Sequence, residues 1–279
     1  MRSKFIRGLI LMELIFAVAI GLLLLSVLME VYLTCERSFR LQNALHQIQD
    51  NAKTATIILK SELFKAGNIG CAKLTYDFPL VPYRSFTLNP RNKLIGNNAN
   101  EIMVSYAGYP NTVLEESMRN EATLYTNINS RFAPNDILLI SDCKQAEIFQ
   151  VSQVKYSRGL QEIISLYPLH SRYEKYAQIA KFESNKYFIA NTHRVNRDGT
   201  AIYALFMEDI NRHKTELVDG IHQMRIMYTI NQSGQWVDVQ PQDVADWSTV
   251  VGVMIELMLD SPPIKKNWYL YARIQEFPI

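Results

Sequence analysis

The pattern of hydrophobic positions divides the chain into an apolar N-terminal segment and a longer, mixed remainder. The residues of Leu9–Leu28 are almost all apolar, and Arg2, Lys4 and Arg7 precede them. About 20 apolar residues are enough for a helix to cross a bilayer. Basic residues on the N-terminal side favour a cytoplasmic N-terminus. We therefore expect a membrane-spanning helix over residues 9–33, with most of the chain on the far side of the membrane.

Three interpretations of this segment compete. A cleavable secretory signal would be cut near Ala17 and Ala19, but the apolar run continues for about two helical turns beyond them. A plain signal anchor explains the hydrophobicity and the orientation but leaves Glu13 without a role. A carboxylate at the centre of a span costs about 2.5–3.5 kcal/mol on insertion scales, unless it lies shallow enough to reach the headgroups. The third interpretation gives Glu13 a partner and depends on Gly8.

A second helical pattern follows the apolar run. Its apolar residues are spaced by threes and fours, which is typical of one face of an amphipathic helix. These residues are Leu41, Leu45, Ile48, Ala52, Ala55, Leu59 and Leu63. No proline occurs from Leu9 to Gly67, and Gly67 and Gly70 favour the end of a helix. We expect one continuous helix with a membrane half at 9–33 and an amphipathic half at 34–67; two helices joined near Thr34 are the alternative.

After Cys71 the hydrophobic pattern changes to a period of two, which is typical of β-strands. Turns are expected at Asp198-Gly199, Ser233-Gly234 and Ser261-Pro262-Pro263. Residues 169–180 are expected to form a loop or a short helix. The expected fold is α+β: a long N-terminal helix packed on an antiparallel β-sheet head at residues 68–279. The expected strands are Ile102–Tyr106, Asp136–Asp142, Ala146–Tyr156, Tyr187–His193, Ala201–Met207, Gln223–Ile230, Val250–Leu259 and Trp268–Ile274.

The overall charge does not indicate a nucleic-acid-binding protein. The formal net charge of the 279 residues is +2, and removal of residues 1–8 would leave +2 − 3 = −1. Charges of both signs are mixed along the chain, so a basic nucleic-acid surface is not expected.

The chain has three cysteines, Cys35, Cys71 and Cys143, in a head expected to be periplasmic. Disulfides persist in that compartment. Cys71 follows the expected helix and Cys143 ends an expected strand, so a Cys71–Cys143 bridge is favoured. Its loop of about 70 residues would contribute roughly 4 kcal/mol in the chain-entropy model. Cys35 is the poorer partner, and three free thiols are the alternative.

The sequence offers few catalytic or metal-binding patterns, and we expect neither an enzyme nor a cofactor. The five histidines form no metal-ligand motif, and no phosphate loop or nucleophile elbow is present. Ser152 and Lys155 match SxxK, but three residues apart on a strand they point to opposite faces. A hairpin turn explains Asn196 and Asp198 better than a calcium loop does. The aromatic stretch at Trp268, Tyr269 and Tyr271 is interpreted as sheet core, with a partner surface as the alternative.

Gly8 closes a short basic leader, and Glu13 is the fifth residue after it. This arrangement resembles the class III prepilin signal of type IV pilins and type II secretion pseudopilins. The resemblance implies that an inner-membrane prepilin peptidase cuts between Gly8 and Leu9 and methylates the new amine of Leu9. That position is most often phenylalanine in the family, so leucine is a mild departure.

The resemblance also gives Glu13 a role in subunit docking. Cleavage creates a positive amine at Leu9, and N-methylation keeps that charge. In a packed filament the amine of one subunit can pair with Glu13 of a neighbour. Removal of either partner would leave an uncompensated charge in an apolar setting, which is strongly destabilising.

Several head segments, in the same order along the chain, resemble PilW-type minor pilins. They are GNIGC (Gly67–Cys71), DILLISDCKQAEIFQV (Asp136–Val151), KYFIA (Lys186–Ala190), IYALF (Ile202–Phe206), LVDGIHQMRIMY (Leu217–Tyr228) and VVGVMIELML (Val250–Leu259). The resemblance implies a subunit that joins other minor pilins and the major pilin to prime pilus assembly at or near the tip, often with a large adhesin. Adhesion, twitching motility and DNA uptake are the processes that such a pilus supports.

Two other functions remain open. A minor pseudopilin of a type II secretion system shares the leader, Glu13, the long helix and the sheet. A signal-anchored periplasmic enzyme would keep its N-terminus and would carry a polar constellation in the head.

Overall fold

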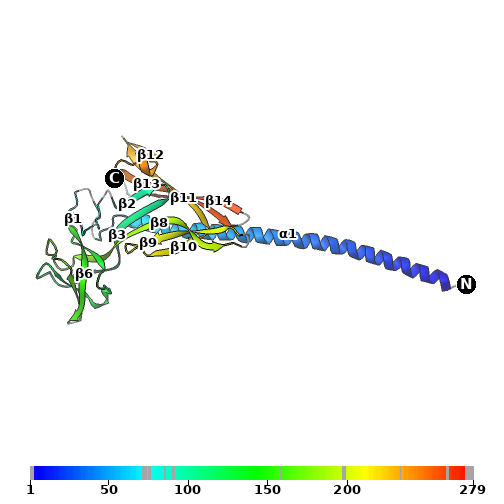
Figure 1. Cartoon of the computed structure of the whole chain (residues 1–279), viewed down its shortest axis with the longest axis horizontal. Coiled ribbons are helices and arrows are strands. Elements are labelled where there is room, and N and C mark those ends of the chain that lie inside the picture. Colours follow the sequence, from blue (N-terminus) through cyan, green and yellow to red (C-terminus); the bar gives the residue numbers. More distant parts are fainter. Residues whose placement is uncertain are drawn as a thin grey trace.

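The structure is a computed structural model (Figure 1). It describes residues 3–70, 74, 77–84, 86–89, 92–157, 159–196, 199–232, 234–261 and 264–273, with the backbone alone for residues 3–11 and 273. One long helix, α1 (Ser3–Lys65), precedes a head built from β-strands. In Figure 1 the N-terminal part of α1 extends away from the head, while its C-terminal part lies among the strands.

The single helix expected from the sequence is confirmed, because α1 runs through Thr34 without a break. Its 63 residues correspond to roughly 95 Å at 1.5 Å per residue. The helix ends two residues before Gly67, which has a φ of +74°. A residue in this left-handed conformation ends helices because the backbone then turns away from the axis, and glycine adopts it without a Cβ clash.

Among the described residues, ten strands form the larger sheet, in the order β10-β9-β8-β5-β6-β7-β4 with β1, β2 and β3 beside this path. Strand β8 is the longest and pairs with β3 along one edge, and with β5 and then β9 along the other. All pairs are antiparallel except β1 with β6. The strands are β1 (Leu80–Val81), β2 (Leu94–Asn98), β3 (Glu101–Val113), β4 (Thr123–Asn127), β5 (Ile137–Ser141), β6 (Ala146–Ser157), β7 (Leu160–Ser165), β8 (Gln178–Val195), β9 (Ala201–Glu208) and β10 (Lys214–Asp219).

A second antiparallel sheet of four described strands has the order β12-β11-β13-β14. Along β13, Val253, Ile255, Leu257 and Leu259 are buried on one face, as the alternation predicts. The strands are β11 (Ile221–Gln232), β12 (Gln235–Val239), β13 (Val250–Ser261) and β14 (Ile264–Arg273); short 3-10 helices lie at Ile128–Ser130, Pro241–Asp243 and Trp247–Thr249.

The main core lies where α1 meets both sheets. One face of the helix, from Ile48 to Leu63, packs with buried residues of β3, β8, β11, β13 and β14. Two smaller cores lie elsewhere in the head. The first contains Leu124, Phe149 and Ile163, and the second contains Ile69, Leu139 and Phe182.

All eight expected strands are present, most with ends shifted by four residues or fewer; β8 starts nine residues earlier than expected, and β3 ends seven residues later. Ile274, the expected end of the last strand, lies outside the described residues. Residues 169–177 form a loop that leads into β8, so a loop is correct there. Leu41 lies on α1 as expected, but it is 44% exposed, and burial begins at Ala44. The apolar spacing extends one turn further toward the N-terminus than the head covers.

Candidate functional site: the bare half of the helix and its junction with the head

The N-terminal half of α1 presents apolar side chains to the outside on every face. All described residues from Met12 to Thr34 are exposed, including Phe16 and Leu24. The helix is long and apolar enough to cross a membrane. Exposed apolar surface on this scale is characteristic of a segment that contacts lipid or other proteins.

Glu13 lies within this apolar segment and is exposed. Among the described residues it has no hydrogen-bond or ion-pair partner in its own chain. The structure places Gly8 and Leu9 inside the first turns of α1, with Leu9 one helical turn before Glu13. A carboxylate without a partner in such surroundings gains most from a positive group supplied by another molecule.

The other half of α1 is held to the head by polar contacts as well as by its buried face. The Asn51 side chain donates hydrogen bonds to the backbone oxygen of Asp219 at 2.9 Å and to its carboxylate at 3.2 Å. Nearer the N-terminus of α1, the Ser261 hydroxyl donates to the amide oxygen of Gln47 at 3.0 Å. These contacts tie α1 to the ends of β10 and β13.

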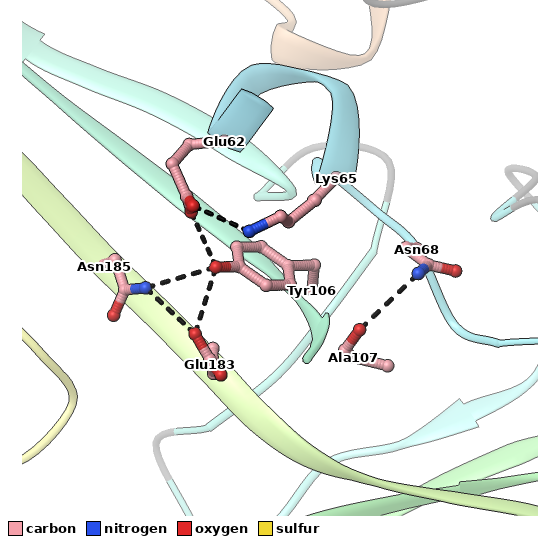
Figure 2. A network of polar contacts seen from close by, with 7 residues as sticks. All are labelled: Glu62, Lys65, Asn68, Tyr106, Ala107, Glu183 and Asn185. Atoms are coloured by element: carbon pink, nitrogen blue, oxygen red, sulfur yellow. Dashed lines mark hydrogen bonds and ion pairs between the residues drawn. The ribbon is translucent and has the colours of Figure 1, made fainter. Parts of the chain in front are cut away.

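A polar network joins the last turn of α1 to β3 and β8 (Figure 2). The hydroxyl of Tyr106 lies 2.6 Å from the Glu62 carboxylate and 3.0 Å from the Glu183 carboxylate. Asn185 donates to both the Tyr106 oxygen and Glu183, at 3.3 and 3.1 Å. The Lys65 ammonium lies 2.7 Å from the second oxygen of Glu62. Residues from three elements are therefore fixed around one phenol oxygen.

Burial raises the pKa of Tyr106 well above its ordinary value, and its hydrogen bond with Glu62 raises it further. The neighbouring Tyr187 hydroxyl is fully buried and has no described partner at hydrogen-bond distance. Burial and then the charge of Glu62 also raise the pKa of Tyr187. Both phenols therefore keep their protons at neutral pH, as the donor role of Tyr106 requires.

The turn after α1 packs closely against Lys93, which is 5% exposed. A Cβ placed on Gly67 would lie 3.0 Å from the Lys93 Cδ. The Gly67 N–H donates to the carbonyl of Ser105 at 2.9 Å, and the Ala107 N–H donates to that of Asn68 at 2.7 Å. Burial lowers the pKa of Lys93. The junction is therefore closed by backbone pairing with β3 on one side and a buried lysine on the other.

The expectation for the three cysteines was a Cys71–Cys143 disulfide with Cys35 left over, and the structure bears on two of them. Cys143 is disulfide-bonded, and Cys35 is free and exposed on α1. Cys71, its expected partner, lies outside the described residues, so the pairing itself stays a prediction. Cys143 has a φ of +68° in the turn between β5 and β6.

The aromatic stretch of β14 corrects one interpretation. Trp268 packs against the main core, but Tyr269 and Tyr271 are 62% and 51% exposed on the outer face of the four-stranded sheet. The core interpretation was therefore wrong for both tyrosines. Their alternation with Trp268, Leu270 and Ala272 is that of a strand with one buried face.

The remaining candidates behave as structural residues. Ser152 and Lys155 lie in β6, and both are exposed. Ser152 is the extra residue at a register shift between Val151 and Gln153, so the simple alternation expected of a strand does not hold there. Asn196 and Gly199 lie in the turn between β8 and β9, with the Gly199 N–H donating to the Asn196 carbonyl at 3.0 Å; Asp198 lies outside the described residues. Within the described ranges, no group of three or more His, Cys, Asp or Glu residues is arranged to hold a metal ion.

Sequence reasoning missed the Glu62–Tyr106–Glu183 network. Glu62 looks like any acid on the solvent side of an amphipathic helix, and its partners lie 44 and 121 residues away along the chain. Comparisons of the chain with protein-family models, curated proteins and solved structures give no match.

Proposed function

We propose that this chain is a membrane-anchored, PilW-like minor pilin that helps to prime type IV pilus assembly. The observation that carries the proposal is the unbroken helix. One half is buried in a β-rich head, and the other half is bare, apolar and long enough to cross a membrane, with Glu13 near its start. A subunit of this shape can be stored in a bilayer and later packed beside similar helices.

In this proposal the prepilin peptidase removes residues 1–8 and methylates Leu9. The amine of Leu9 in one subunit then pairs with Glu13 of its neighbour, so that each carboxylate is neutralised only on assembly. An unpaired charge in apolar surroundings costs several kcal/mol, which makes correct docking selective. Before assembly the head lies in the periplasm and the helix in the inner membrane; afterwards the subunit lies in the pilus at the cell surface.

The junction between helix and head has a mechanical role in this proposal. Force on a filament subunit passes from the helix to the head through the buried face of α1 and the Glu62 network. Two sheets and a disulfide at Cys143 make the head rigid in the periplasm, where disulfides persist. The head then presents its surface to other minor pilins and to an adhesin, the partners that the PilW resemblance implies.

The test compares Glu13→Gln with Glu30→Gln, a second exposed acid in the bare half of the helix. Both variants are expressed in place of the natural chain, and their amounts are measured in the inner membrane and in sheared pili. We expect Glu13→Gln to stay in the membrane and to fall at least tenfold in pili, and Glu30→Gln to match the natural chain. Entry of Glu13→Gln into pili at the natural level would sink the proposal.

A further inference from the structure

The free edge of β14 is the longest regular strand edge at the margin of either sheet. Its residues pair with β13 in ten consecutive steps, from Ser261↔Ile264 to Gly252↔Arg273, without a bulge. Among the described residues no strand pairs with its other edge. In an antiparallel edge strand, every second residue turns its N–H and C=O away from its neighbour. The outer edge of β14 is therefore a row of backbone donors and acceptors available for pairing.

The other marginal strands are blunted in ways that are common in natural sheets. Strands β2, β4 and β12 have five residues each. Strand β10 has six, with a register shift between Glu216 and Val218. Short or bulged edges pair poorly with an incoming strand. Compared with these four strands, β14 has the longer and more regular outer edge.

The side chains of β14 leave this edge open. Tyr269 donates a hydrogen bond to Glu256 of β13 at 3.0 Å, so its side chain leans across β13. The Tyr271 hydroxyl lies 2.8 Å from the position that a Cβ on Gly252 would occupy, so it also covers β13. On the opposite face, Trp268 and Leu270 pack into the main core with α1. Tyr269 and Tyr271 therefore lie toward β13, away from the outer edge, and Trp268 and Leu270 lie on the face that packs into the main core.

The charges along β14 indicate what kind of segment fits. Lys265 and Lys266 are both exposed, and neither has an ion-pair partner among the described residues. No acid occurs from Ile264 to Arg273. The Glu256 carboxylate beneath the tyrosines already receives Arg225, Asn267 and Tyr269 as donors, so it adds no free negative charge. Opposite charges on paired strands are favourable and like charges are unfavourable.

We propose that β14 is a strand-addition site for an extended, acidic segment of a partner protein. Backbone hydrogen bonds to the free edge supply the affinity, as in other cases of β-strand addition. Carboxylates of the segment lie opposite Lys265 and Lys266, and uncharged side chains lie beside Tyr269 and Tyr271. A second copy of this chain is the poorer occupant, because its β14 would bring lysines and no acids. The proposal is independent of the pilus assignment, since it requires only the edge and its charges.

The experiment uses the full chain in detergent micelles and hydrogen exchange at single-amide resolution. Alone, the outward amides of β14 should exchange at least 100-fold faster than the amides that pair with β13. The probe is a synthetic ten-residue peptide of alternating threonine and valine with two glutamates at its C-terminal end. Antiparallel pairing places those glutamates opposite the two lysines. Two control peptides carry lysines in place of the glutamates, or backbone N-methyl groups at alternate residues.

We expect the acidic peptide to protect the outward amides of β14 and not those of β12, and both control peptides to bind at least tenfold more weakly. The double variant Lys265→Glu/Lys266→Glu should reverse the preference between the acidic and the lysine peptide. The matched control, Lys144→Glu/Lys155→Glu, alters two other exposed lysines and should leave it unchanged. Slow exchange of the outward amides in the chain alone, or equal binding of the acidic and N-methylated peptides, overturns the proposal. The proposal is also overturned if Lys265→Glu/Lys266→Glu still binds the acidic peptide more tightly than the lysine peptide. The two lysines would then not select an acidic segment and would only prevent self-pairing.

Discussion

Glu62, one turn before the end of α1, accepts a hydrogen bond from Tyr106 of β3 across 2.6 Å, and this contact joins the helix to the larger sheet (Figure 2). Both residues are largely shielded from water, with Tyr106 only 2% exposed and the Glu62 side chain 14% exposed. Hydrogen bonds to a charged group contribute more than neutral ones, about 1.5–3 kcal/mol. The contact therefore fixes how the long helix emerges from the head.

Substitution of Tyr106 by phenylalanine should destabilise the head by about 1–3 kcal/mol at pH 7, because Glu62, Glu183 and Asn185 lose their shared hydroxyl. Urea unfolding of the full chain in micelles, followed by tryptophan fluorescence, measures the change. Tyr109→Phe removes a hydroxyl from a 77% exposed tyrosine and should stay within about 0.5 kcal/mol of the natural chain. Equal stabilities for the two variants would contradict the role given to the network.

The same phenol predicts an alkaline limit to stability. The pKa of Tyr106 is raised in the folded state. The phenol is therefore protonated in both the folded and the unfolded protein below pH 10, and above pH 10 it ionises only in the unfolded protein. The unfolded state then binds fewer protons, and stability falls with rising pH. The natural chain should lose stability more steeply than Tyr106→Phe between pH 10 and 11.5. The test is the urea midpoint of both chains, measured at half-unit steps of pH. If the midpoints of the natural chain and Tyr106→Phe fall in parallel as the pH rises, the prediction is wrong.

Lys93 predicts a pH dependence of the opposite sign. Its pKa is lowered by burial, so between that pKa and 10.5 the unfolded state binds more protons than the folded state. Stability should therefore rise with pH in this window. Lys93→Met should be more stable than the natural chain at pH 7, with a smaller difference at pH 9.5. Thermal unfolding at pH 7 and pH 9.5 measures the stability difference between the two chains at each pH. If Lys93→Met is less stable than the natural chain at pH 7, the Lys93 ammonium has a partner that stabilises it by more than its burial costs.

The buried face of α1 should be sensitive to truncation where the outer face is not. Leu59→Ala removes a side chain that is 1% exposed between the sheets and should cost about 2–5 kcal/mol. Ile57→Ala, two residues away on the same helix, alters a 59% exposed side chain and should cost less than about 1 kcal/mol. Urea unfolding measures the loss of stability in each variant. Similar losses for Leu59→Ala and Ile57→Ala would mean that the helix face at Leu59 is not the one packed against the head.

Gly67 should tolerate substitution less well than another glycine with a similar backbone. Gly67→Ala introduces a Cβ at a φ of +74° and 3.0 Å from Lys93, so it should cost more than about 1 kcal/mol. Gly159→Ala has a similar φ of +78° but no atom within 4 Å of the new Cβ. The difference between the two variants in thermal unfolding isolates the effect of close packing at the helix end. No difference would show that Lys93 moves aside freely.

Periodicity predicts the parts of this fold that are long and have one buried face. Burial alternates from Met224 to Tyr228 in β11 and from Val253 to Asp260 in β13, and α1 has a regular apolar face, so these elements could be predicted from the sequence. Strands β1, β2, β4, β7, β10 and β12 have six residues or fewer and were missed, because so few positions establish no period. Strand β5 is equally short but was predicted, since Ile137–Ile140 form an unbroken apolar run. Tyr269 and Tyr271 were misassigned for a different reason. An aromatic residue suggests burial, but the faces of a strand are distinguished only by what packs on each.

The contacts that define the candidate sites were less accessible to sequence reasoning. Gly8, Leu9 and Glu13 could be proposed as site residues from the sequence because their spacing is local. The Glu62 network arises from residues far apart in the chain, and the free edge of β14 from the lack of a second neighbouring strand among the described residues. Neither leaves a pattern within a short window of sequence.

The most direct test of the central claim is the intact mass of the full chain, extracted from the membranes of cells that contain prepilin peptidase. We expect the mass of residues 9–279 plus one methyl group, with the methyl on the amine of Leu9. A Gly8→Val variant should keep all 279 residues and remain in the membrane. A natural chain that keeps residues 1–8 in the presence of the peptidase would contradict the assignment as a pilin.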